Sequence, residues 1–411
     1  MIMKKQLLNI LPYTILLISI SSILQWCSLP IGNTFLWWLL QSTILFIFFY
    51  LSPKCYSIFP IKIFLIYVAF SAIYGAIYMT ENYWDWKLLV YNLMVFLLPI
   101  AVYIFSNANL LQKVLQFWLK YAWILLIILT PFLSSDAFGR FLVPYSFLSL
   151  FIFFVNRKNK IILIIAYLVT ITFGYASRSD VLKFTVCLLI GGTLYFPIIR
   201  RFFYSFQRKI LYLLWLTPIM LFVLGITGIF NVFQIEKELG LEGKFELTSS
   251  TSDNKYSALI DTRTFLYQEE IKSAIKHNYV IQGRSIARGY ESYSFGKSID
   301  KDLGIQRGER QSCETSILNV FNYFGIIGVI LYFIIFVTAS YKGVTQSHNL
   351  FVPLIGIYVA FRWLFAWIED FSRFDLNYLF LWIMIGICYS PQFRGMSNRE
   401  FYIWLRTLTK Y

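Results

Sequence analysis

The chain has few charged residues for its length. Of its 411 residues, 14% are charged, whereas soluble globular proteins typically carry about 25%. Apolar residues make up 58% of the sequence and aromatic residues 20%. A single water-facing fold cannot hide that much apolar surface. This balance excludes a soluble multidomain enzyme, a disordered chain and a secreted scaffold held by disulfides.

Histidine, cysteine and nucleotide-binding motifs are also scarce. The sequence contains 2 His and 5 Cys. It has no zinc-ligand spacing, no Walker loop, no GxSxG elbow and no dinucleotide-binding fingerprint. Cys27 and Cys313 both fall near the predicted outer surface, so a disulfide between them is one arrangement that the topology allows. We expect no bound metal and no cofactor.

Long apolar runs take the place of these motifs. A membrane-spanning helix needs about 20 predominantly apolar residues, and the first such run extends from Leu7 to Leu29. Further runs lie at about 35–52, 60–79, 88–106, 114–134, 139–156, 161–177, 180–199, 210–231, 313–340, 350–368 and 376–391. The sequence therefore predicts an all-α, polytopic membrane protein with about twelve transmembrane helices.

Basic residues are concentrated in alternate loops. The formal net charge is +15, which in a soluble protein would indicate nucleic-acid binding. Here Lys54, Lys113, Arg157 and Arg200 mark loops of one set, and the loop with Glu81 and Asp85 belongs to the other. Because basic loops stay in the cytoplasm, we expect both termini to be cytoplasmic. The partner of the chain is then the lipid bilayer, with no nucleic acid.

One long polar segment divides the chain into three parts. Residues 1–231 hold the first nine predicted helices, and residues 313–411 hold the last three with a cytoplasmic tail. Residues 232–312 form a predicted extracytoplasmic loop with a short amphipathic helix. Asp261 or Thr262 can cap this helix. Its apolar face is formed by Tyr267, Ile271, Ala274 and Ile275.

Three places on the predicted outer face combine residues suited to phosphate and proton chemistry. The turn Ser177–Asp180 contains Arg178, the loop helix begins near Arg263, and Glu314 opens the tenth predicted helix. Guanidinium groups bind phosphate oxygens in bidentate fashion, and a helix N-terminus adds backbone donors. A carboxylate nearby can take a proton from a hydroxyl group. Arg362 lies inside a predicted span, which by itself suggests a functional role.

Each residue taken singly also has a structural interpretation. Arg178 could simply extend to the lipid headgroups, and Arg263 could be a solvated loop charge. Glu314 could only complement the dipole of its helix. Arg362 and Arg373 could pair with Glu369 and Asp370.

In combination and in this order, the motifs resemble those of the bacterial O-antigen and capsular polysaccharide polymerase and ligase superfamily. The resemblance rests on Ser177-Arg178-Ser179, on Arg263 leading to Ile281-Gln-Gly283-Arg-Ser285, and on Glu314-Thr315 followed by Gly325 and Gly328. Ser285 stands where the family usually has a second glycine. The ligase branch has His followed by Asn, Ser or Gln where this chain has Glu314-Thr315, so the sequence is more similar to the polymerase branch.

The resemblance implies metal-independent transfer of glycans between undecaprenyl diphosphate-linked donors and acceptors, at the outer leaflet of the bacterial cytoplasmic membrane. Arg178, Arg263 and Glu314 would be the catalytic residues. Further substrate-binding residues would be Arg284, Arg310, Arg362 and Arg373. A flippase and a chain-length regulator would be protein partners.

Two other functions remain open. A ligase would use the same chemistry with a lipid A core or another acceptor. A flippase of lipid-linked oligosaccharides would have paired repeats and polar residues near the midplane, whereas the charges of this chain gather at one predicted face.

Overall fold

Helices make up nearly all the regular structure of the computed structural model, which describes residues 2–23, 26–28, 34–52, 58–173, 178–231, 246–248, 255–257 and 263–408. The first group of helices comprises α1 (Ile2–Ser21), α2 (Thr34–Leu51), α3 (Phe59–Tyr74), α4 (Tyr83–Leu97), α5 (Ala101–Phe105), α6 (Ala108–Leu129), α7 (Ser135–Leu142), α8 (Ser146–Ser149), α9 (Arg157–Phe173), α10 (Arg178–Gly192) and α11 (Pro197–Thr227). The second group comprises α13 (Arg263–Lys276), α14 (Gly296–Leu303), α15 (Ser316–Thr345), α16 (Val352–Phe365), α17 (Leu376–Tyr389), α18 (Pro391–Gly395) and α19 (Asn398–Leu408).

The remaining regular elements are short. A π-helical turn at Gly75–Met79 extends α3, and 3₁₀ turns lie at Leu98–Ile100, Thr130–Phe132 and Val143–Tyr145. Two antiparallel strand pairs join β1 (Glu246–Thr248) to β2 (Lys255–Ser257) and β3 (Tyr290–Glu291) to β4 (Glu309–Arg310).

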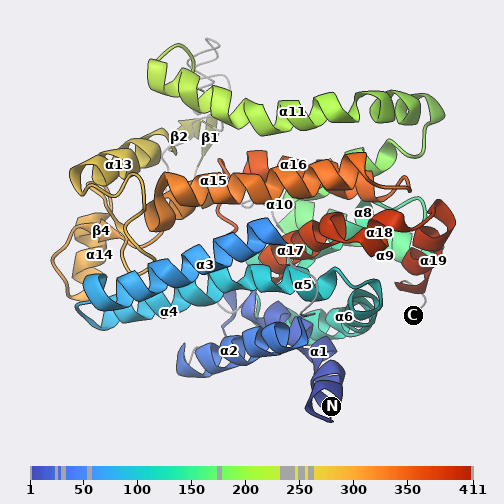
Figure 1. Ribbon diagram of the computed structural model, residues 1–411, viewed down its shortest axis with the longest axis horizontal. Helices are drawn as coiled ribbons and strands as arrows, with labels where there is room; N and C mark the ends of the chain where they lie inside the picture. Colours follow the sequence, from blue (N-terminus) through green and yellow to red (C-terminus); the bar gives the residue numbers. More distant parts are fainter. Residues whose placement is uncertain are drawn as a thin grey trace.

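The long helices form a bundle with distinct ends (Figure 1). Helices α3, α4, α11 and α15 run along the bundle, and α13, α14 and β4 cover one end of it. We call this the α13 end. The C-terminus and α19 lie toward the opposite end. The segments after α11 that are richest in polar residues are thus collected at one end of an apolar bundle.

The described helices are apolar enough for a membrane protein. Six of them have the length and composition needed to cross a bilayer: Thr34–Leu51, Phe59–Met79, Tyr83–Phe105, Ala108–Phe132, Pro197–Thr227 and Ser316–Thr345. Large apolar side chains such as Phe35 and Phe49 on α2, and Leu213 and Met220 on α11, are exposed on the outside of the bundle. Exposed apolar surface on this scale suits contact with lipid. The prediction of a mainly helical chain is confirmed, and the six apolar helices are compatible with a membrane-embedded protein.

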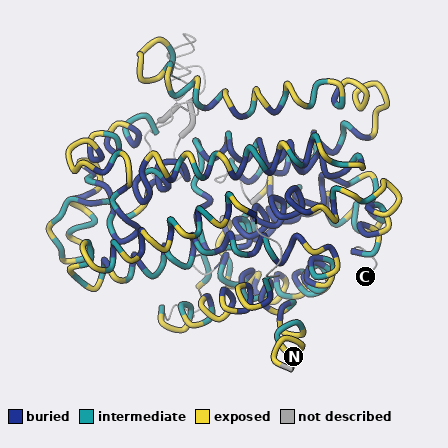
Figure 2. The backbone as a smooth tube through the Cα atoms, in the orientation of Figure 1, coloured by how far each residue is buried: buried dark blue, intermediate teal, exposed yellow. Residues whose placement is uncertain are grey.

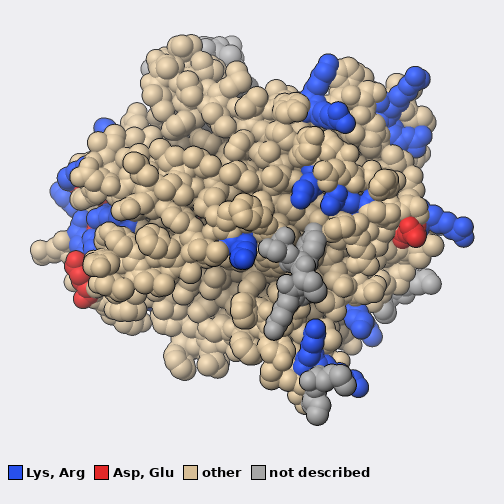
Figure 3. Space-filling view, viewed as in Figure 1, with Lys and Arg blue, Asp and Glu red and all other residues tan. Residues whose placement is uncertain are grey.

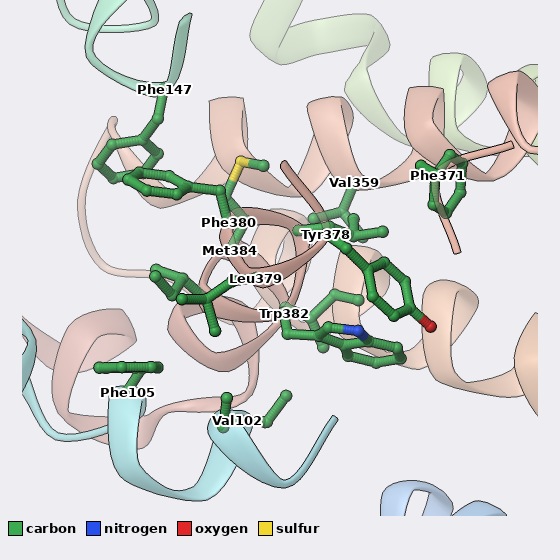
Figure 4. Close-up of a cluster of buried hydrophobic side chains, with 14 of the residues drawn as sticks. Val102, Phe105, Phe147, Val359, Phe371, Tyr378, Leu379, Phe380, Trp382 and Met384 are labelled. Carbon is green, nitrogen blue, oxygen red and sulfur yellow. The ribbon is translucent and has the colours of Figure 1, made fainter. Parts of the chain in front are cut away.

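Helices α16 and α17 form the interior of the bundle (Figure 2). Every residue of α17 except Asn377 is buried, as expected for a helix that is apolar on all sides. Tyr378 and Trp382 of α17 pack edge-to-face, with ring centroids 5.5 Å apart (Figure 4). This core fixes the connection between α16 and α17, residues 366–375, which we call the central loop.

One predicted helix is broken into pieces. The sequence predicts a continuous span over 139–156, but the structure has α7, a 3₁₀ turn at Val143–Tyr145 and the single turn α8. Pro144 lies in the 3₁₀ turn and has no N–H to donate to an α-helical ladder. Ser146 and Ser149 are buried there, where α8 packs against α10 rather than facing outward. Average hydropathy cannot distinguish these two surroundings.

Two glycines at positive φ bring distant motifs together. Gly325 interrupts α15 at φ 62°, and Gly283 lies at φ 79°. A Cβ at Gly283 would approach Phe324 N to 2.3 Å, and one at Gly325 would approach Ile281 O to 2.2 Å. The backbones also bond directly, since Ile326 N–H donates to Val280 O at 2.9 Å. The predicted GxG-like element therefore lies in the break of α15, where only glycine fits without displacing backbone.

Ser285 adopts a glycine-like conformation at the next turn. Its φ is 91°, a region in which a side chain is strained. Its hydroxyl group donates to Ser71 O at 3.0 Å and accepts from Ala287 N–H at 3.3 Å. These two bonds compensate for the backbone strain and tie the turn to α3.

Candidate functional site

The start of α10 is joined to the central loop by a buried lysine. Lys183 is 1% exposed, and its Nζ lies 2.9 Å from Asp180 Oδ1 and 2.9 Å from Glu369 Oε1. A Cβ at Gly139 would come within 2.7 Å of Asp180 Oδ2, so α7 packs closely against the same carboxylate. Because an unpaired buried charge is costly, this ion triad holds α10 against the loop.

Arg178 is the first residue of α10, two residues before Asp180. Its side chain, like all of Ser177, lies outside what the structure describes. The described backbone places the N-terminus of α10 beside the central loop. The start of α10, at which the sequence predicts anion binding, is thus next to this loop.

The start of α15 meets the central loop from another side. Ser316 N–H donates to Glu369 O at 3.1 Å, and Phe371 N–H donates to Ser316 Oγ at 2.8 Å. Ser316 Oγ also lies 3.3 Å from Asp370 Oδ1. Glu314, two residues earlier, is therefore held near the same loop as the start of α10.

Glu314 has a half-exposed carboxylate paired with an arginine. Its Oε1 lies 3.0 Å from Arg310 Nη2, and its side chain is 50% exposed whereas that of Arg310 is 16% exposed. The Arg310 guanidinium also stacks over the Phe295 ring at 4.3 Å. Its Nη1 is buried without a hydrogen-bond partner among the described residues. Arg310 therefore has a donor left for a ligand, and Glu314 is open to an incoming group.

Helix α13 begins at Arg263, as the capping residues predict. Tyr267, one turn later, donates its hydroxyl hydrogen to Trp367 O at 2.7 Å. Asp261 and Thr262, the predicted caps, lie outside the described residues. The first turn of α13, and with it Arg263, is thus fastened to the central loop.

The burial of the side chains on α13 agrees only in part with the predicted apolar face. Of the predicted apolar face, Tyr267 is buried and Ile271 lines a groove, but Ile275 is 63% exposed. Glu270 instead is fully buried. Of the four residues predicted for the apolar face, Tyr267 and Ala274 are thus buried as predicted, whereas Ile275 is on the surface.

Glu270 is a buried carboxyl group that the sequence analysis missed. Its Oε1 accepts from the Tyr279 hydroxyl group at 3.3 Å, and Oε2 has no hydrogen-bond partner among the described residues. Burial raises the pKa of Glu270 well above its ordinary value, and the Tyr279 bond and the Arg284 charge oppose this only in part. Burial therefore favours the uncharged form of this carboxyl group. Its sequence signal is its spacing, three residues after Tyr267 and four before Ala274, which puts it at the edge of the predicted apolar face.

An apolar groove of about 450 Å³ runs between α11, α13 and α16. Its walls include Phe222, Ile226, Tyr267, Ile271, Leu364 and Trp367. Thr264 and Lys272 also line it. Thr264 directly follows Arg263, so the groove begins beside the first turn of α13. Its size and lining suit an apolar chain with a polar end.

Arg362 and Arg373 both support the central loop. Arg362 is 1% exposed; its Nη1 donates to Asn377 Oδ1 at 3.1 Å, and its guanidinium lies 4.5 Å from the Phe371 ring centroid. The Nε and Nη2 atoms of Arg362 have no hydrogen-bond partner among the described residues. Arg373 Nε lies 3.7 Å from Asp370 Oδ2. Arg362 is thus beneath the loop, whereas Arg373 lies within it.

Arg284 belongs to a separate set of ion pairs. Its Nη2 lies 2.8 Å from Glu309 Oε1, and its Nη1 donates to Gly289 O at 2.7 Å. Arg288 also pairs with Glu309. Further along, Arg307 pairs with Asp85 at 2.7 Å and with Glu81. We call the set Glu81, Asp85, Arg284, Arg288, Arg307 and Glu309 the arginine clamp.

The two cysteines considered for a disulfide, Cys27 and Cys313, are both free thiols. Burial raises the pKa of Cys313 to about 11, so this thiol stays protonated at neutral pH. Among the described residues, no group of three or more His, Cys, Asp and Glu side chains is placed to hold a metal ion.

Charged side chains on the visible face lie mostly toward the ends of the bundle, and acidic ones are seen only there (Figure 3). Of the predicted site residues, the structure brings Arg310, Glu314 and Arg373 to the central loop, together with the starts of α10 and α13. Arg284 lies in the arginine clamp instead.

Comparison of the chain with protein-family models, with curated proteins and with solved structures gives no match.

Proposed function

We propose that the protein is a glycosyltransferase of the bacterial cytoplasmic membrane that polymerises oligosaccharide units linked to undecaprenyl diphosphate. The observation that carries this proposal is the meeting of three separate segments at the central loop. Lys183 joins α10 to Glu369, Ser316 joins α15 to Asp370, and Tyr267 joins α13 to Trp367. Each segment contributes one of the residues with which the sequence resembles O-antigen polymerases.

The apolar groove is the binding site for the lipid tail in this proposal. It lies between α11, α13 and α16 and begins beside the first turn of α13. A polyprenyl chain lying there would place its diphosphate next to Arg263 and the backbone donors of that turn. Bidentate guanidinium bonds to phosphate supply both charge and geometry.

The proposed reaction is a displacement at the anomeric carbon of the donor sugar. The oxygen of an acceptor hydroxyl group forms the new bond to that carbon, while the bond from carbon to the diphosphate oxygen breaks. The electron pair and the developing negative charge go to the diphosphate, which Arg178 and Arg263 stabilise. The Glu314 carboxylate accepts the proton of the acceptor hydroxyl group. Arg310 holds that carboxylate in place.

The membrane arrangement that fits this function has about twelve spans, with the α13 end outside and both termini in the cytoplasm. A single cysteine at Ser298 on α14, in a chain without native cysteines, tests the orientation. We expect it to react with an impermeant thiol reagent in intact spheroplasts. Labelling only after lysis would reverse the orientation and place the site on the wrong side for an exported donor.

The glycan made by a deletion strain tests the function. Loss of a polymerase should leave single repeat units exported and attached, with no ladder of longer chains. Loss of a ligase should leave long chains on the lipid carrier, and loss of a flippase should hold single units on the cytoplasmic side. Either of the last two results would refute the polymerase assignment. Purified protein should also extend lipid-linked units without added metal, in keeping with the family that the sequence resembles.

A further inference from the structure

A second cavity lies on the other side of the central loop from the apolar groove. It has a volume of about 390 Å³ and is bounded by the end of α1, by α2 and α4, and by the end of the central loop. Its lining is unusually aromatic: Trp26, Trp37, Trp38 and Tyr91. The polar lining includes Gln41, Arg373 and Asp375. We call it the tryptophan cavity.

The tryptophans of α2 face this cavity and not the lipid. Trp38 and Gln41 are three residues apart and share one side of the helix. Leu36 and Leu39 occupy the opposite side, and they are 44% and 55% exposed. Helix α2 thus presents plain apolar side chains outward and reserves its indole and amide groups for the cavity.

The cavity is built onto the central loop by hydrogen bonds from the end of α1. Ser21 Oγ donates to Phe374 O at 2.9 Å, and Leu376 N–H donates to Ser22 Oγ at 2.8 Å. Gln41 is seven residues into α2, about 10 Å from the start of that helix at 1.5 Å per residue. The cavity therefore extends from the central loop well into the bundle.

One polar side chain of the cavity has unused hydrogen-bonding capacity, and a second is a half-buried carboxylate. Gln41 is 7% exposed, and its Oε1 is buried with no hydrogen-bond partner among the described residues. An acceptor left in this state costs about 1–3 kcal/mol, which a ligand hydroxyl group would recover. Asp375 uses Oδ1 to cap α17, accepting from Tyr378 N–H at 2.8 Å. Burial raises the pKa of Asp375 to about 6, so its carboxylate lacks full solvation.

This combination selects a saccharide over other ligands. A sugar ring has apolar C–H faces that stack on indole rings and an edge of hydroxyl groups that both donate and accept. Gln41, Arg373 and Asp375 supply partners of both kinds. A lipid tail would leave these polar groups without partners. The cavity volume also falls within the range of about 300–1,000 Å³ that is usual for small ligands.

We propose that the tryptophan cavity binds a sugar residue of the acceptor glycan. Its role as the acceptor subsite rests on the proposed polymerase function, whereas saccharide binding itself does not. Trp367 and Ile368, near the start of the central loop, line the apolar groove. Arg373 and Asp375, at the end of the loop, line the tryptophan cavity. Between them along the loop lie Glu369 and Asp370, which contact α10 and α15. The two substrates would thus approach the reacting residues from opposite sides.

Direct binding is the first test. The probe is a short oligosaccharide released by mild acid from the surface polysaccharide of the source strain, and the readout is saturation-transfer NMR with the full-length protein in nanodiscs. Trp38→Leu and Gln41→Leu should each weaken binding about tenfold or more, the loss expected for about 1.4 kcal/mol. Trp38→Phe keeps an aromatic face and should recover most of the affinity. The matched control is Phe35→Leu, a side chain of the same helix that is 72% exposed and does not line the cavity, and this variant should bind like the wild type.

Three binding results would overturn the proposal: no binding by the wild type, wild-type binding by Gln41→Leu, or an equal loss in Phe35→Leu. Because Gln41→Leu conserves side-chain volume, this variant still tests the proposal if Trp38→Leu does not accumulate in the membrane.

Turnover separates this proposal from the polymerase assignment. With lipid-linked units as substrates, Gln41→Leu should raise the KM for the acceptor while kcat changes little. Polymer formation with an unchanged acceptor KM would reject the acceptor subsite and leave the polymerase in place. Saccharide binding that depends on Trp38 and Gln41, without any polymer formation, would keep the binding site and reject the polymerase.

Discussion

Two groups of arginines and carboxylates lie at the α13 end, and they differ in how completely their members satisfy one another. In the arginine clamp, three arginines meet three acids, and no buried nitrogen or oxygen of these described side chains lacks a partner. Around the central loop, Arg310 Nη1 and Glu369 Oε2 are buried without hydrogen-bond partners in the described chain. Buried polar groups are normally paired, so the second group is the one prepared for a ligand.

The clamp has a mechanical role that explains its saturation. Arg307 reaches Asp85 and Glu81 at the turn between α3 and α4, and Arg288 and Arg284 share Glu309. These pairs fasten residues 284–309 onto the bundle. An arginine whose N–H donors are already bonded to carboxylates and carbonyl groups has few donors free to bind substrate. We therefore infer that Arg284 acts through the position of this segment, whereas Arg310 and Arg263 would lie at the reacting groups of the proposed transferase.

The sharpest test of this contrast replaces one acid from each group. Glu314→Gln keeps the size of the side chain but cannot accept a proton, and we expect a 10²- to 10⁴-fold loss of kcat, about 3–5 kcal/mol of barrier. The melting temperature should hardly change, because the Glu314 side chain is half exposed. The control, Glu309→Gln, should lower the melting temperature instead. Turnover of purified protein and thermal unfolding in the same detergent provide both measurements. Near-normal turnover of Glu314→Gln would leave that residue only its helix-dipole role.

Arginine geometry should matter at Arg263. Arg263→Lys keeps the charge but loses the planar fork that matches phosphate, and removing a donor to a developing negative charge typically costs about 10²- to 10³-fold in kcat. The glycan ladder of a complemented deletion strain, at matched protein level, reports the effect in cells. Arg178→Ala should give a comparable loss. If Arg178→Ala and Arg263→Ala both produce a normal ladder, the anion site is wrong and these arginines only interact with headgroups or solvent.

A substitution in the arginine clamp should lower the stability of the protein and leave kcat nearly unchanged. Arg288→Met leaves Glu309 with a single partner in a site where its side chain is 10% exposed. Removing one member of a buried pair typically costs about 3–5 kcal/mol, and because Arg284 remains we expect about 3 kcal/mol. Thermal unfolding would show the loss, while kcat per folded molecule at a permissive temperature should stay near that of the wild type. A fall in kcat without a change in melting temperature would place the clamp in the reaction.

The sequence predicted the parts of the molecule that depend on local patterns. Helical spans follow from runs of apolar residues, and α13 begins at Arg263 because its capping and periodicity signals are local. The ion pairs did not follow, since Asp85 and Arg307 are 222 residues apart. The mean hydropathy of a segment is also the same whether its side chains are buried in protein or in lipid. It therefore missed the break at Pro144.

The smallest expected effect concerns the pH dependence of the central loop. Burial raises the pKa of Asp375 to about 6, above the value of about 3.9 for an exposed Asp. The folded protein thus binds this proton more tightly than the unfolded chain, and the resulting stabilisation is present below about pH 4 and is lost as the pH rises through about 6. Asp375→Asn still caps α17 but stays neutral. Its melting temperature should equal that of the wild type at pH 4 and exceed it modestly at pH 7. Parallel melting curves for the two proteins across this range would show that Asp375 is solvated or paired, and that the cavity side of the loop is as well satisfied as the clamp.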